Sequence, residues 1–384
     1  MPGANRSYRI LVLGGYGHFG GRICRALAHS ATLIIAGRDG ARAAYAARVL
    51  NSENSAIAPG AAHVAAHESE VLDYTASDLA ERLRALRVDA VIHTCGPFQG
   101  QSYHVARACV AARAHYIDLA DGRAIVAGIT DLDAAARNSG VLLVSGASTL
   151  PALSSAVIDE HCGHFSQLDA IDISIAPGQQ TPRGVATLEA VLSYCGKPFT
   201  VWEQGHWQTV HGWQGMHRFN YPQFGSRWLA RCDVPDLQLF PNHYAGVQRV
   251  RFDAGLELAL AQWVFWLLAG MVRLGLIGNA SRLARILQTW GRHFDWMGSD
   301  TGGMHIGLRG AGYDGRPARI DWHLVARRGH GPEIPCIPAI VLARKLAAGS
   351  IDTRGAMPCM GLMTLAEFAE AAAHLDIAWR TSFT

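Results

Sequence analysis

The segment Leu11–Gly21 reads Leu-Val-Leu-Gly-Gly-Tyr-Gly-His-Phe-Gly-Gly, follows the apolar run Tyr8–Leu13 and opens a helical stretch. Gly15, Gly17 and Gly20 form the pattern G-x-G-x-x-G within it. Between a strand and a helix, the first glycine permits a tight turn, the second lets a pyrophosphate approach the backbone, and the third lets the helix pack close to the strand. The segment therefore predicts a dinucleotide-binding loop. The pattern alone leaves open a glycine-rich turn that binds nothing.

An arginine after the second predicted strand indicates which dinucleotide binds. The strand Thr32–Ala36 continues as Gly-Arg-Asp, at the position where NAD-specific proteins usually carry an acidic residue that contacts the ribose. The guanidinium of Arg38 would instead pair with the 2′-phosphate of NADP. We therefore expect NADP, with NAD as the alternative. Asp39 is either a displaced ribose ligand or a helix N-cap.

Further cofactor contacts are expected where later strands of the same sheet end. Asp73 precedes a predicted helix and is either an adenine-edge contact or a turn residue. The strand Ala90–Thr94 ends in a Gly-Pro turn beside the expected crevice. The loop, the arginine and these strand ends together give the predicted cofactor-binding residues, which are Gly15, Tyr16, Gly17, His18, Phe19, Gly20, Arg38, Asp73, Cys95, Gly96, Pro97 and Phe98.

The order of apolar runs predicts the domains. Strand-like and helical runs alternate through residues 1–150, which predicts a Rossmann-type, doubly wound parallel sheet, with a third strand near His63–Ala66. Residues 151–334 mix half-exposed strands with helices, which predicts a second α+β domain with a mainly antiparallel sheet for substrate binding or dimerisation. Residues 335–384 are expected to be helices that return to the first domain.

The composition limits the function. Hydrophobic residues make up 49% and charged residues 17% of the 384 residues, as in a folded protein. A net charge of +3 without a basic stripe does not favour a nucleic-acid partner. Eight dispersed cysteines with no C-x-x-C pair favour a reducing compartment, so we expect a cytoplasmic protein. No metal-ligand spacing appears among the His and Cys residues, so no metal site is predicted.

The segment Leu256–Gly278 is largely apolar but is interrupted by Glu257, Gln262 and Arg273. Its uninterrupted part is far shorter than the roughly 20 residues that a membrane-spanning helix needs. Two readings therefore stay open. The segment is either a buried helix or lid over an apolar pocket, or it associates with a membrane surface.

The motifs, in this order, resemble the NADP-binding domain of the saccharopine dehydrogenase-like family. They are the glycine loop, the Ala-Gly-Arg after the second strand, the Gly-Pro-Phe turn, the His-Tyr-x-Asp-Leu segment His115–Leu119, the strand entry Gly140-Val141 and the loop Gly146–Pro151. The resemblance covers residues 8–160 and is weaker beyond them. It implies an NADP(H)-dependent oxidoreductase that transfers a hydride to or from a C=N or C=O bond, or a C=C bond in relatives that act on lipid-like molecules. We also expect a homodimer.

Such chemistry needs an acid or base within reach of the reacting heteroatom. Tyr116 and Asp121 flank the end of the fifth strand of the first domain, and His330 lies in the loop Arg328–Pro335, which is rich in glycine and proline. We predict these three residues as catalytic. The competing readings are a core aromatic for Tyr116 and a hinge with a solvent-exposed ring for His330.

The substrate is the least determined part of the prediction. A carboxylate substrate would require arginines, and the candidates are Arg183, Arg218, Arg227, Arg231 and Arg249. All ten tryptophans follow residue 200, which favours a bulky apolar substrate in a pocket lined by some of Trp202, Trp207, Trp213, Trp263 and Trp266. The alternative function is a non-catalytic nucleotide-binding or lipid-associated protein with a Rossmann domain.

Overall fold

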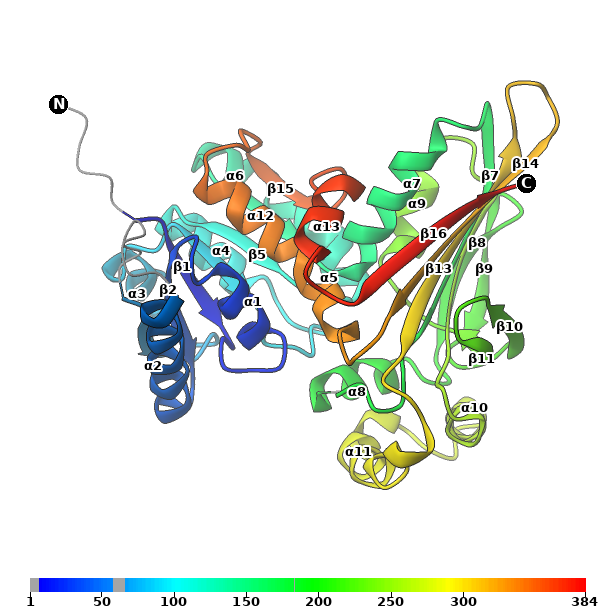
Figure 1. Ribbon diagram of the computed structural model, residues 1–384, viewed down its shortest axis with the longest axis horizontal. Coiled ribbons are helices and arrows are strands. Elements are labelled where there is room, and N and C mark those ends of the chain that lie inside the picture. The colour runs from blue at the N-terminus through cyan, green and yellow to red at the C-terminus, as the bar shows by residue number, and fades with distance from the viewer. Residues whose placement is uncertain (1–6, 58–65, 183) are drawn as a thin grey trace. The chain divides into compact units, whose positions relative to one another are not determined.

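The computed structural model describes residues 7–57, 66–182 and 184–384, and it divides into two compact units (Figure 1). Unit 1 comprises Met1–Ala120, Ile125–Ala152 and Pro335–Met363, and unit 2 comprises Asp121–Ala124, Leu153–Ile334 and Thr364–Thr384. The C-terminal part therefore differs from the prediction, because only its first portion belongs to unit 1 and its last 21 residues belong to unit 2.

Unit 1 is built on a seven-stranded sheet in which every pairing is parallel. The strands, in spatial order, are β15 (Gly355–Pro358), β6 (Leu142–Ser145), β5 (His115–Asp118), β4 (Ala90–His93), β1 (Arg9–Leu13), β2 (Thr32–Gly37) and β3 (Glu68–Val71). The order reverses beside β1, as in a doubly wound sheet. The Rossmann-type prediction is confirmed. The third strand was expected at His63–Ala66, which lies almost wholly outside the described residues.

Both faces of this sheet are covered, because successive residues of its strands point to opposite sides. Ile10 and Val12 pack in one core, and Leu11 and Leu13 pack in another. The helices of unit 1 are α1 (Gly20–Leu27), α2 (Gly40–Ile57), α3 (Leu79–Ala85), α4 (His104–Ala112), α6 (Asp133–Asn138) and α12 (Ile337–Ala347), and α5 (Arg123–Ala127) spans the boundary of the units in sequence. The first core draws on α1, α2 and α12, and the second draws on α3, α4 and α6.

Unit 2 contains a nine-stranded, mostly antiparallel sheet, which confirms the predicted fold class. Its strands run in the order β10 (His217–Tyr221), β11 (Gly225–Arg231), β12 (Arg249–Ala254), β7 (Gln167–Ala176), β13 (Gly302–Ala311), β14 (Pro317–Ala326) and β16 (Ile377–Phe383), with β8 (Pro198–Glu203) and β9 (His206–His211) as a hairpin on β12. Only the pairing of β12 with β7 is parallel. The last strand was expected to be helix, but β16 pairs along β14.

The helices of unit 2 are α7 (Ser154–Cys162), α8 (Val185–Ser193), α9 (Asp236–His243), α10 (Ala259–Arg273), α11 (Ala284–Arg292) and α13 (Leu365–Ala372). The apolar segment Leu256–Gly278 contains α10, which ends at Arg273. Gly275 has φ +76°, which a helix interior does not allow. Among the described residues, no helix is both long enough and apolar enough to cross a membrane.

A buried carboxyl group in unit 2 allows a test of the packing of α7 and α9. Asp236, in the first turn of α9, is fully buried, and its Oδ1 accepts a hydrogen bond from the Ser154 hydroxyl of α7. Burial raises the pKa of Asp236 from 3.8 to about 7. Because the folded-state pKa lies above the unfolded one, the stabilising contribution is complete below about pH 4 and is lost as the pH rises towards 7.

We therefore expect Asp236→Asn to flatten the pH profile of stability. The free energy of unfolding of the natural protein should fall, relative to that of the variant, between about pH 4 and pH 7. Chemical denaturation across this range measures the difference, and Asp314→Asn at the exposed turn after β13 is the control. Parallel profiles for the natural protein and Asp236→Asn would contradict the expectation.

Candidate functional site

The glycine loop is so tightly wound that side chains do not fit at its glycines. A Cβ at Gly20 would lie 2.2 Å from Gly14 O, and a Cβ at Gly17 would lie 2.9 Å from the same atom. Gly14 has φ +78°, and its N–H donates to Ala36 O at 2.8 Å, which ties the loop to β2. The loop therefore offers bare backbone at its surface, as a pyrophosphate requires.

The start of α1 is suited to an anion. The helix begins at Gly20, and its N-cap residue, Phe19, makes no side-chain hydrogen bond to the first turn. The helix dipole favours negative charge at this end. Arg22 donates to His18 O at 2.7 Å and so adds a cation to the loop. Burial, and then the charge of Arg22, lower the pKa of His18, so its ring is neutral at physiological pH.

Tyr16 lies across the end of β2. A Cβ at Gly37 would lie 2.4 Å from the Tyr16 hydroxyl, so a side chain there would displace the Tyr16 ring. The hydroxyl accepts a hydrogen bond from Asp39 N at 3.1 Å, and the Arg42 guanidinium lies 4.8 Å from the centre of the Tyr16 ring. Asp39 Oδ1 accepts from Arg42 N at 3.1 Å, which makes Asp39 the N-cap of α2. Of its two readings, the structure supports the helix cap.

Arg38 is exposed at this strand end, and it is close enough to Asp73 and Cys95 to affect both. Hydrogen bonds from the Thr75 amide and hydroxyl lower the pKa of Asp73, and Arg38 adds to the effect. Burial raises the pKa of the Cys95 thiol to about 12. The ends of β2, β3 and β4 thus bring together three of the predicted cofactor contacts, while the Asp73 carboxylate also holds its own turn.

The Gly96-Pro97 turn is held by hydrogen bonds from Gln101 and is followed by the buried ring of Phe98. Gln101 Nε2 donates to Cys95 O at 2.8 Å and to Pro97 O at 2.7 Å. Phe98 is buried, and its ring meets that of His93 edge-on at 5.2 Å. No sequence motif includes Gln101, because its role depends on the fold of the turn.

Tyr116 lies in the interior of unit 1, next to a histidine that the sequence reasoning missed. Its hydroxyl is 3.1 Å from His93 Nδ1, and both side chains are buried. Burial lowers the pKa of His93 to about 3 and raises that of Tyr116 well above 10, so both are neutral. Within the described residues, His93 Nε2 has no hydrogen-bond partner. The position of His93, last in a strand beside the glycine loop, was the signal that could have identified it.

The other two predicted catalytic residues lie in unit 2. Asp121 is half-buried in the short segment Asp121–Ala124. His330 is also half-buried, and its Nδ1 accepts a hydrogen bond from Asp376 N at 2.7 Å. This bond leaves the neutral ring with its proton on Nε2, so His330 has a donor to offer.

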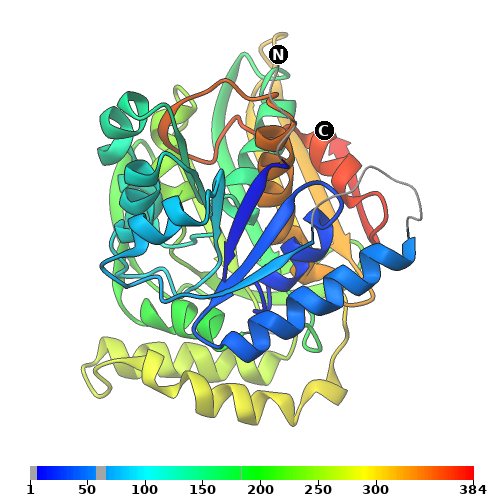
Figure 2. The same cartoon turned by 90° about the vertical axis from the view of Figure 1, so that its left-hand side faces the viewer.

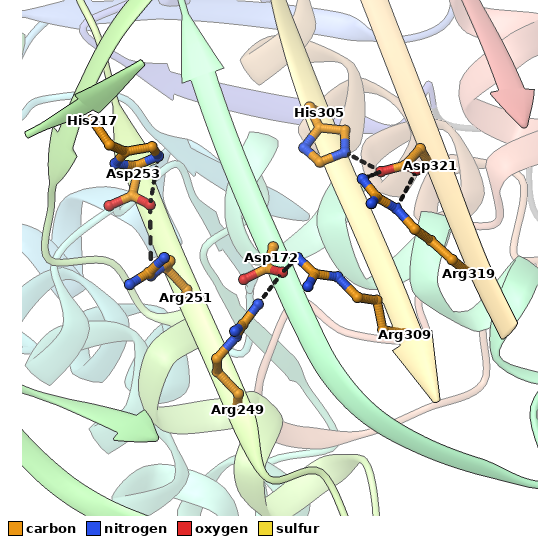
Figure 3. Close-up of polar contacts among 9 residues, drawn as sticks. All are labelled: Asp172, His217, Arg249, Arg251, Asp253, His305, Arg309, Arg319 and Asp321. Atoms are coloured by element: carbon orange, nitrogen blue, oxygen red, sulfur yellow. Dashed lines mark hydrogen bonds and ion pairs between the residues drawn. The ribbon is translucent and has the colours of Figure 1, made fainter. Parts of the chain in front are cut away.

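One face of the unit 2 sheet carries an array of ion pairs (Figure 3). Asp172 of β7 lies between Arg249 and Arg309, and the Arg309 nitrogen is 2.7 Å from its Oδ2. Asp253 of β12 faces His217 and Arg251 at 3.9 Å, and burial raises its pKa. Strand register explains the two contacts of Asp172, because Ala170, two residues earlier on the same face of β7, is paired with Arg249 of β12 and with Arg309 of β13. Each carboxylate is therefore neutralised within the sheet.

A third part of the array is a group that could hold a metal ion. His305, Asp321 and His323 place ligand atoms within 4.8 Å of one another. However, Asp321 accepts hydrogen bonds from His305 at 2.8 Å and from Arg319 through both oxygens at 2.6 and 3.0 Å. These bonds lower the pKa of Asp321 although burial opposes them. A metal would have to displace Arg319, so the donor set fits an ion-pair network better.

Most arginines considered for a carboxylate substrate are already paired. Arg227 binds Glu257 at 3.1 Å, Arg231 lies 3.8 Å from Asp253, and Arg249 binds Asp172. Arg218 is exposed and stacks on Trp228 at 5.7 Å, and Arg183 lies outside the described residues.

The tryptophans considered for a pocket are distributed over the β8–β9 hairpin, the segment after it and α10. Trp213 is buried, and Trp202 donates to Val247 O at 2.7 Å, so both contribute to the packing of unit 2. Trp207, Trp263 and Trp266 are exposed.

Residues 10–144 match the family model described as the saccharopine dehydrogenase NADP binding domain. The matched segment contains the glycine loop, Arg38, the Gly-Pro turn and Tyr116. Among curated protein sequences, none is similar enough to this chain to count as a match.

A solved structure shares the fold over nearly the whole chain at low sequence identity. Apo saccharopine dehydrogenase (L-Glu forming) from Saccharomyces cerevisiae has a TM-score of 0.67 and 13% identity, with 98% of this chain and 100% of the yeast chain covered. An amine dehydrogenase from Mycobacterium smegmatis has a TM-score of 0.45 and 11% identity, with 92% and 95% covered. The family-model match and the yeast fold confirm the resemblance. The chain is thus an NAD(P)-dependent oxidoreductase that carries a saccharopine dehydrogenase NADP-binding domain.

Proposed function

We propose that the protein is an NADP(H)-dependent oxidoreductase that transfers a hydride to or from a C=N or C=O bond. With an apolar substrate, the same hydride transfer would take place at a C=C bond. The observation that carries the proposal is the pair of arginines at the end of β2. Arg38 is exposed beside the glycine loop, and Arg42 lies over the Tyr16 ring. Both cations suit the 2′-phosphate that distinguishes NADP from NAD.

Each element of unit 1 has a separate task in this proposal. The glycine loop and the first turn of α1 bind the pyrophosphate through backbone N–H groups. Tyr16 supports Arg42, and Asp73 and the Gly96–Phe98 turn border the remaining parts of the cofactor. The bound dinucleotide supplies the hydride. The protein must supply the proton, and the buried, neutral Tyr116 is better suited to position His93 than to donate to a substrate.

We propose that His330 donates a hydrogen bond from Nε2 to the reacting heteroatom, and that Asp121 is the acid–base group that transfers the proton. Two features support His330: its ring is only half-buried, and the bond from Asp376 N leaves the proton on Nε2. The glycines on either side, Gly329 and Gly331, allow a substrate to approach the backbone. A non-catalytic nucleotide-binding protein would instead bind cofactor and turn over no imine, ketone or enoyl compound.

The substrate, the assembly and the compartment belong to the same proposal. The pairing of Arg227, Arg231 and Arg249 with carboxylates supports a bulky apolar substrate over a small dicarboxylate. We propose a homodimer, which sedimentation equilibrium would test. The free thiols of all eight cysteines support the proposed cytoplasmic location.

Substitutions at two adjacent glycines test the loop. A Cβ at Gly20 would lie 2.8 Å from Gly15 Cα, whereas one at Gly21 would lie 3.8 Å from Gly15 O, an ordinary contact. We expect Gly20→Ala to weaken cofactor binding and to cost about 1–3 kcal/mol of stability. Gly21→Ala should leave binding unchanged and stabilise α1 by about 0.5–1 kcal/mol. Fluorescence titration and thermal unfolding measure both. Equal behaviour of the two variants would contradict the geometry.

Charge reversal at Arg38 tests the cofactor preference. Arg38→Asp removes a charge-assisted hydrogen bond and adds a carboxylate that repels the 2′-phosphate. We therefore expect this variant to bind NADPH about tenfold more weakly or worse. NADH binding should change little, because NADH lacks the 2′-phosphate. The control is Arg48→Asp, because Arg48 is as exposed a residue as Arg38 but lies within α2. An equal loss of affinity for NADPH and NADH would refute the assignment of NADP.

Replacement of His330 tests the hydrogen-bond donor. His330→Phe should lower turnover by about 10²–10³-fold on whichever imine, ketone or enoyl compound is reduced, with the Kd for NADPH unchanged. His374→Phe, at an exposed position after α13, is the control. Unchanged turnover would remove His330 from the mechanism.

A further inference from the structure

The exposed apolar surface of unit 2 is concentrated on α10, α11 and the turns that follow them. Twelve of the seventeen large hydrophobic side chains that are exposed among the described residues lie between residues 258 and 297. We call these twelve the hairpin surface: Leu260, Trp263, Val264, Trp266, Leu267, Leu274, Leu276, Ile286, Trp290, Phe294, Trp296 and Met297. The two helices run side by side at one end of unit 2 in both views (Figures 1 and 2). Such a concentration marks an interaction surface.

The outer face of α10 is as apolar as its inner face. Phe265 and Leu268 are buried, and the Phe265 ring packs against Trp213 at 4.9 Å. Leu260, Val264 and Leu267 follow one another at helical spacing on the other side and stay exposed. A helix that only covers a core carries polar residues on its outer face. The core of unit 2 therefore accounts for one side of α10 and leaves the other without a role.

The charge of the same region identifies what it contacts. Residues 258–297, which span the hairpin surface, contain four arginines and one acidic residue, Asp295, whereas the whole chain has a net charge of only +3. All four arginines are exposed: Arg273, Arg282, Arg285 and Arg292. Trp290, which lies between Arg285 and Arg292 in the sequence, is 66% exposed. Trp296, which follows Arg292, is 78% exposed. Tryptophan and arginine next to aliphatic side chains are typical of helices that lie in the interface of a bilayer.

We propose that α10 and α11 dock the protein on the surface of an anionic lipid bilayer. The hairpin surface enters the boundary between headgroups and acyl chains, and the four arginines contact lipid phosphates. A second copy of this chain fits the hairpin surface less well than a bilayer does. A two-fold interface would place this predominantly cationic surface against itself. The inference does not depend on the cofactor proposal, because it uses no residue of unit 1.

Vesicle binding by the full-length protein tests the proposal. We expect sedimentation with vesicles of phosphatidylcholine and phosphatidylglycerol, weakening as salt is raised, and little with phosphatidylcholine alone. Trp290→Ser with Trp296→Ser, and separately Arg282→Glu with Arg285→Glu, should each weaken binding about tenfold or more. The matched controls are Tyr313→Ser and Arg316→Glu at the exposed turn after β13. Unchanged NADPH binding and circular dichroism show that the variants are folded.

Two results would overturn the proposal. One is a natural protein that stays in the supernatant with both kinds of vesicle. The other is a tryptophan double variant that dissociates an oligomer while vesicle binding is unaffected, which would make the hairpin surface a subunit interface. If either double variant fails to fold, insertion is tested on the natural protein. The measurement is quenching of its tryptophan fluorescence by brominated phosphatidylglycerol. Quenching supports insertion, and its absence refutes it.

Discussion

A backbone-to-backbone contact at the start of α1 holds unit 1 in the form that a dinucleotide requires. Gly20 approaches Gly14 so closely that a methyl group would lie 2.2 Å from its carbonyl oxygen. The same turn ties three strands together, since Gly14 N donates to Ala36 O and Thr94 N donates to Leu13 O. The ends of β1, β2 and β4 therefore meet at the turn, and Arg38 and Asp73 lie close enough to each other to interact electrostatically.

Unit 1 was predictable because its decisive features are local in sequence. The alternation of strand-like and helical runs predicts the parallel sheet, and the glycine pattern between a strand and a helix predicts the loop. What the pattern could not indicate is how side chains meet across the fold. Arg42 matters because Tyr16, far away in sequence, lies against Gly37 and carries the guanidinium on its ring. His93 matters because Tyr116 reaches it from the neighbouring strand.

Unit 2 was less predictable because long-range pairing overrides local preference there. The segment 377–383 was read as the end of a helical region, yet β14 offers it an edge to pair with along its whole length. The roles of Arg231 and Arg249 follow from strand register, which places Asp253 and Asp172 beside them. No spacing within one segment of sequence carries that information.

Arginine has two different uses in this chain, and its partners separate them. On the polar face of unit 2, guanidinium groups bind carboxylates of the same or a neighbouring strand, so their charge is neutralised within the fold. Arg38 and the arginines of residues 258–294 have no carboxylate within ion-pair distance among the residues that the structure describes. A solitary surface charge contributes little to stability. Their settings, beside a phosphate loop and among exposed tryptophans, therefore point to anions from outside the chain as their partners.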